Sequence, residues 1–136
     1  MKQLISEIAD QFYDEISSNY FFSAFFVGKD IPAIKILLKY FIYHQLTCET
    51  DKMNFLKSYE LGIIHADQGI PLNTILNFIE QFQQRLFEVC KQNPEKCEGL
   101  KIANIDLLRN WLSKGYLHGT IKNIDIMSIP LFSVLS

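Results

Sequence analysis

A single histidine near the end of a predicted helix is the residue best suited to chemistry in this sequence. His65 stands within residues 61–71 (LGIIHADQGIP), where Gly69 fits the left-handed position after a helix and Pro71 the first turn of the next one. A neutral imidazole in a last helical turn can donate one ring proton to a backbone carbonyl, here that of Leu61, and present its other nitrogen to a metal. The alternative interpretation is a structural histidine that only satisfies such carbonyls.

The other reactive side chains form no recognisable site. Cys48, Cys90 and Cys97 lack the spacing of metal-binding pairs, and their odd number in a chain expected in the cytosol predicts reduced thiols. Because Cys90 and Cys97 flank the turn at residues 93–94, a redox pair is the alternative. His44, near another helix end, is interpreted as structural. The sequence contains no nucleophile and base pairing, phosphate loop or paired-carboxylate motif, so we expect no enzyme.

The composition indicates one domain that is rich in aromatic rings. The chain has 136 residues, of which 49% are hydrophobic and 13% aromatic, including eleven Phe and six Tyr. So many rings favour either tight packing or a pocket for a flat apolar group. The formal net charge of -2 is spread along the chain and provides no surface for nucleic acid or an anionic membrane. No apolar run approaches the ~20 residues of a membrane span and no signal-peptide pattern occurs, so we expect a cytoplasmic protein.

Helical periodicity predicts an all-α fold with five main helices, at about residues 2–19, 30–45, 50–68, 72–92 and 100–124. Asp30 is expected to cap the second, whose broad apolar face predicts extensive burial. The third should turn Phe55, Leu56, Tyr59, Ile63 and Ala66 inward. The fourth is expected to be the longest, and its core-facing residues recur four and three apart: Ile75, Ile79, Phe82, Leu86 and Val89.

Three stretches permit two interpretations each. The aromatic residues at 21–26 either fill the core or line a cavity. Gly115 and Gly119 mark either a point where another helix crosses closely or a frayed helix end. Residues 126–136 form an apolar tail interrupted by Pro130, which either docks on the body or leads into a linker and a partner surface.

The histidine segment, together with residues 12–16 (FYDEI) and the Phe25-Phe26 pair, resembles the sensor-globin domain of globin-coupled sensors and protoglobins. In that family the segment matching 61–71 carries the proximal haem histidine and leads into a long helix. The resemblance implies a globin-like fold for residues 1–125, followed by the tail at 126–136. Because the chain begins near the family's second helix, we expect it to lack the usual N-terminal helices.

The resemblance also implies the site residues. His65 matches the proximal ligand of haem b, and Tyr13 matches a distal tyrosine whose hydroxyl can hydrogen-bond a bound gas. The helix that contains Pro32 would cover the distal face, and Ile70 and Phe78 would contact the other side of the ring. The distal contacts implied are Ile34, Leu37, Leu38 and Phe41.

The implied function is a gas sensor that binds oxygen or another diatomic gas, with haem iron in an apolar pocket. The last two long helices are expected to form a homodimer, and the family joins such a globin to a transmitter domain or partner protein. The alternative is a globin-fold signalling or protein-interaction module that binds no haem, as some relatives do.

Overall fold

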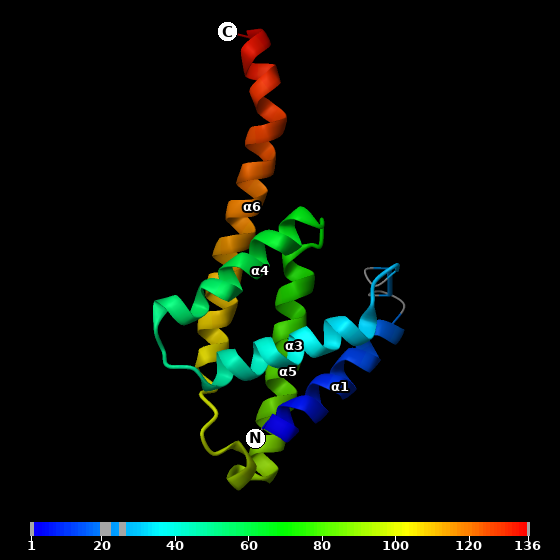
Figure 1. Cartoon of the computed structure of the whole chain (residues 1–136), viewed down its shortest axis with the longest axis vertical. Coiled ribbons are helices and arrows are strands. Elements are labelled where there is room, and N and C mark those ends of the chain that lie inside the picture. Colours follow the sequence, from blue (N-terminus) through cyan, green and yellow to red (C-terminus); the bar gives the residue numbers. More distant parts are fainter. Residues whose placement is uncertain (1, 20–22, 25–26, 136) are drawn as a thin grey trace. The chain divides into compact units, whose positions relative to one another are not determined.

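The chain is all-α, as its sequence predicts. The computed structural model describes residues 2–19, 23–24 and 27–135, and within these the side chains of all but 52 and 125–135. The described residues form no strand. The elements follow one another along the chain (Figure 1) as α1 Lys2–Ser18, α3 Ile31–Thr47, η2 Lys52–Phe55, α4 Leu56–Asp67, α5 Leu72–Gln92, η3 Pro94–Cys97 and α6 Asn104–Leu135. The aromatic stretch at 21–26 lies outside the described residues apart from residues 23 and 24.

Helix α3 begins and ends at hydrogen-bonding side chains. The Asp30 carboxylate accepts the backbone N–H of Ala33 at 3.1 Å, which confirms the predicted N-cap. At the other end, Asn104 is almost fully buried, and its amide Nδ2 donates to the carbonyl of Gln45 at 2.9 Å. Because the last carbonyls of a helix have no intrahelical partners, this bond satisfies a group that burial would otherwise penalise.

The described residues divide into two compact units, of which the first comprises Met1–Glu49 and Phe78–Ile105. Its core joins the apolar stripe of α1 to the seam of α5. Phe12 contacts Phe78 and Phe82 edge to face, with ring centroids 6.1 and 5.8 Å apart. The buried residues of this core are Leu4, Ile5, Ile8, Ala9, Phe12, Ile16, Ile42, Leu46, Phe82, Leu86 and Ile105.

The predicted broad burial of α3 is wrong for this chain. Only Ile42, Gln45 and Leu46 are buried on α3. Its apolar side chains at Ile36, Leu37 and Tyr40 are 55%, 70% and 63% exposed. The hydrophobic pattern of α3 therefore includes large side chains that remain mostly exposed.

The second unit comprises Thr50–Asn77 and Asp106–Ser136, and in it α4 crosses α6 with almost no gap. A Cβ added at Gly115 would lie 1.9 Å from the carbonyl oxygen of Tyr59, and one at Gly62 would lie 2.1 Å from that of Leu112. Only glycine permits such a close approach of two backbones. Of the two interpretations of the glycine pair, the crossing point is confirmed.

This crossing also changes which face of α4 is buried. The buried residues of α4 are Ser58 and Gly62, whereas Leu56 is 37% exposed. The first turn of the predicted helix is a separate 3-10 segment, because the Asp51 carboxylate accepts the N–H of Met53 at 3.1 Å and starts a tighter turn. The inward stripe predicted from large apolar residues is therefore wrong at Leu56, and small residues occupy the contact instead.

Helix α6 is longer than its sequence suggests. It continues through Pro130 to Leu135 and has 32 residues, compared with 21 in α5, which the sequence suggested was the longest. Proline removes one backbone hydrogen bond and bends a helix, but the following residues can still form helical bonds. The predicted end near Ile124 is wrong, and the tail is part of α6 up to Leu135. Within the described residues, no helix combines the length and apolarity needed to cross a membrane.

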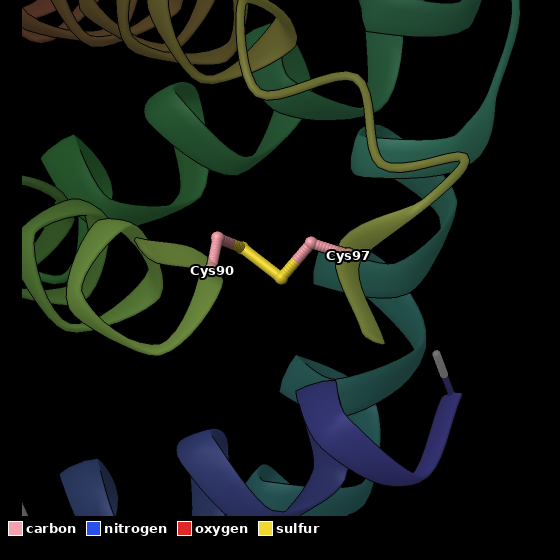
Figure 2. Close-up of a disulfide and its surroundings, with 2 residues drawn as sticks. All are labelled: Cys90 and Cys97. Carbon is pink, nitrogen blue, oxygen red and sulfur yellow. A yellow bond between two sulfur atoms is a disulfide. The ribbon is translucent and has the colours of Figure 1, made fainter. Parts of the chain in front are cut away.

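Two of the three cysteines form a disulfide, so the expectation of three reduced thiols is wrong. Cys90, near the end of α5, is bonded to Cys97 in η3 (Figure 2). The turn at Asn93 and Pro94 brings their Cα atoms to 5.5 Å, which lies within the range that a disulfide requires. Cys48 is the remaining free thiol.

Candidate functional site

His65 lies in the last turn of α4, at a helix end that carries a glycine cap. Gly69 has a φ of 73°, the N–H of Gly69 donates to the carbonyl of Ala66 at 3.1 Å, and that of Ile70 donates to the carbonyl of His65 at 3.1 Å. These two bonds form a Schellman motif, in which His65 supplies the carbonyl of the longer bond. The predicted glycine cap is confirmed, and α5 begins at Leu72 shortly after it.

The imidazole of His65 is held in the form that a metal ligand needs. Its Nδ1 donates to the carbonyl of Leu61 at 2.7 Å, as the sequence predicted. Burial lowers the pKa of His65, against the opposing effect of the Leu61 hydrogen bond, so the neutral form is favoured. With the proton on Nδ1, Nε2 carries the free lone pair.

A metal bound at His65 must bring most of its own ligands. Among the described residues, no group of three or more His, Cys, Asp or Glu side chains could hold a metal ion. One protein imidazole would be sufficient for haem iron, because the porphyrin brings four nitrogen donors of its own. The donor chemistry of His65 therefore fits haem better than it fits a zinc site built only from side chains.

Helix α6 contacts the same region through Tyr116. Its hydroxyl donates to the carbonyl of Ile70 at 2.7 Å. Ile70 thus has both backbone groups bonded, the N–H to His65 and the carbonyl to Tyr116. Of the predicted site residues, the structure brings Ile70 and His65 together, through their backbones. No local sequence pattern indicated Tyr116, whose partner lies 46 residues away.

The remaining predicted site residues lie in the other unit. Tyr13 follows the buried Phe12 on α1, and burial raises the pKa of Tyr13 to about 12. Its hydroxyl therefore stays protonated and able to donate a hydrogen bond at neutral pH. Leu38, Phe41 and Phe78 are partly buried and pack against the core of this unit.

The predicted contacts on α3 differ in exposure. Ile34 is half-buried, whereas Leu37 has 70% of its surface exposed. An open groove of about 680 Å³ lies between α1 and α3, and none of the predicted haem contacts lines it. The lining residues are Lys2, Gln3, Ile5, Ser6, Ile36, Lys39, Tyr40 and Tyr43.

His44 has a structural partner. The side-chain amide Nε2 of Gln45 donates to Nδ1 of His44 at 2.9 Å. This bond uses Nδ1 of His44 as the acceptor, so that nitrogen is not available as a metal ligand. This geometry supports the structural interpretation of His44.

Comparison with protein families gives a match that covers most of the chain. The family model described as Protoglobin matches residues 1–112, most of the 136-residue chain. No curated protein and no solved structure matches the chain significantly. The matched range contains Tyr13, His65 and all the predicted haem contacts.

Proposed function

The chain belongs to the protoglobin family, and on that premise we propose that it is a haem-binding gas sensor and not an enzyme. The observation that carries the proposal is the state of His65, which is neutral and bonded to Leu61 through Nδ1. Haem, when bound, supplies an iron centre that takes up diatomic gases, and oxygen is the first candidate here.

The chain's own residues would perform three tasks. His65 would hold haem b through Nε2, and the Leu61 carbonyl would fix its tautomer and increase its basicity. Tyr13 would donate a hydrogen bond from its protonated hydroxyl to the gas. The apolar contacts proposed for the ring are Ile34, Leu37, Leu38, Phe41, Ile70 and Phe78.

We propose that the signal leaves through a homodimer formed by α5 and α6. In support, α6 exposes three large apolar side chains spaced four and three residues apart, which places them on one side of a helix. Leu117, Ile121 and Ile124 are 59%, 49% and 57% exposed. A transmitter domain or partner protein would receive the signal. The proposed location is the cytoplasm, where the Cys90–Cys97 disulfide would be open to reduction by cellular thiols.

Haem titration of the purified protein tests the proposal. The wild type should bind one haem per chain with a Soret band, His65→Ala should lose most of this binding, and the matched variant His44→Ala should keep it. A wild type that stays colourless but still dimerises would refute the haem proposal and support a globin-fold interaction module instead. Ile121→Glu should shift the dimer toward monomer in analytical ultracentrifugation, and an unchanged dimer would exclude this surface.

A further inference from the structure

The end of α4 is held from two sides. On one side is its own Schellman motif, in which the carbonyls of His65 and Ala66 accept backbone N–H groups. On the opposite side, α6 donates the Tyr116 hydroxyl to Ile70, the last residue of that motif. A helix end that relied on its cap alone would be free to fray into the following loop.

The position of Tyr116 follows from the crossing of the two helices. Tyr116 directly follows Gly115, at the point where α6 and α4 touch backbone to backbone. Further along α6, Gly119 lies against Ala66, the neighbour of His65, where an added Cβ would be 2.9 Å from that methyl group. The Tyr116 hydroxyl therefore extends from a part of α6 that cannot slide freely along α4.

The His65 side chain depends on this same turn. Its Nδ1 bonds to a carbonyl four residues earlier, so the bond requires helical geometry from Leu61 to His65. The His65 carbonyl is bonded to Ile70, so loss of the cap would release the last turn and the ring orientation together. At the carbonyl of Ile70, the residue whose N–H completes this cap, the Tyr116 hydroxyl donates its hydrogen bond.

We propose that Tyr116 is a positioning residue for His65. Its hydroxyl fixes the cap of α4 to α6 and thereby keeps the imidazole in the orientation and tautomer that leave Nε2 as the ligand. The role in ligation rests on the proposed function, whereas the effect on the ring is a property of the haem-free protein.

The test compares Tyr116→Phe with Tyr59→Phe. Each variant removes one hydroxyl from the α4 and α6 pair, but the Tyr59 hydroxyl bonds to His118 instead of the cap. Nitrogen NMR of the haem-free protein reports the protonated ring nitrogen of each histidine, and His44 serves as an internal reference. In Tyr116→Phe, the His65 Nδ1 proton should exchange about five- to tenfold faster, the effect of losing one hydrogen bond. In Tyr59→Phe it should be unchanged.

Equal exchange at His65 in both variants, with similar losses of thermal stability, would overturn the proposal and leave Tyr116 as one of many stabilising contacts. Should Tyr116→Phe not fold, the Ile70 amide of the wild type gives a second measurement. It should be protected from exchange, and rapid exchange would contradict a fixed cap.

The haem-loaded protein separates this proposal from the proposed function. The iron–histidine stretching band should shift in Tyr116→Phe and remain in place in Tyr59→Phe. If no variant binds haem, the proposed function fails, while the NMR comparison still decides whether Tyr116 positions His65.

Discussion

Replacing Gly115 by alanine should destabilise the protein, although the same change stabilises most helices. Alanine in place of glycine within a helix ordinarily gains about 1 kcal/mol. Here the new Cβ would lie 1.9 Å from the Tyr59 carbonyl oxygen, and ordinary contact begins at 3.4 Å, so the helices must separate by about 1.5 Å. Because the obstacle is backbone, no side-chain rotation relieves it.

The expected magnitude follows from the loss of contact along the crossing. A gap of about 1 Å, smaller than this separation, already forfeits up to about half of the dispersion energy of the atoms that line it. Overpacking in cores costs about 1–3 kcal/mol, sometimes more, so after the gain in helix propensity we expect a net loss of about 2 kcal/mol. For a domain of this size that corresponds to a melting temperature lower by about 8 °C.

Thermal and urea unfolding provide the assay, with two comparison variants on the same helix. Asn110→Ala, at an exposed position, should gain about 0.5 kcal/mol from helix propensity alone. The stability of Gly119→Ala should lie between those of Asn110→Ala and Gly115→Ala, because the nearest obstacle to its new Cβ is a methyl group at 2.9 Å. A Gly115→Ala protein as stable as the wild type, or more stable, would refute the close crossing of α4 and α6.

Three further predictions concern the disulfide and the titrating groups. Replacing Cys90 and Cys97 by serine should lower the free energy of unfolding by about 2.5 kcal/mol. The disulfide closes a loop between residues seven positions apart, and without it the unfolded chain gains conformational entropy. Urea titration measures this, and an unchanged unfolding midpoint would contradict it. Burial lowers the folded-state pKa of His65, so its stabilising contribution should be complete above the unfolded pKa of about 6.5 and be lost as the pH falls through the folded pKa. The pH profile of His65→Gln should lack this loss, and parallel profiles would argue against a buried His65. Burial raises the pKa of Tyr13 to about 12, so its contribution should be complete below about pH 10 and be lost as the pH rises toward 12. Tyrosinate absorption in wild type and Tyr13→Phe measures this, and a Tyr13 that ionises with the exposed tyrosines would contradict it.

Local signals made much of the fold predictable. The cap at Asp30, the glycine at Gly69 and the apolar seam of α5 act over a few residues, and each lies where the sequence placed it. Hydrogen bonds between neighbours, such as that from His65 to Leu61, follow from helical spacing and were predictable for the same reason.

Features that depend on distant residues were missed. The buried face of α4 carries Ser58 and Gly62, because α6 approaches there, and a pattern based on large apolar residues gives these small ones no weight. The bond from Tyr116 to Ile70 joins residues 46 apart, and no local rule specifies it. The continuation of α6 through Pro130 contradicts the usual preference of proline, which is a tendency and not a prohibition.

The central claim is that His65 is the haem ligand, and imidazole rescue tests it most directly. His65→Gly removes the proposed ligand and leaves the other proposed haem contacts unchanged, and free imidazole can enter the space that the side chain vacates. The absorption spectrum of the reduced, haem-loaded wild type should be that of a histidine-ligated globin. His65→Gly should lose this spectrum and regain it when imidazole is added. A His65→Gly protein that keeps the wild-type spectrum without imidazole would contradict the claim.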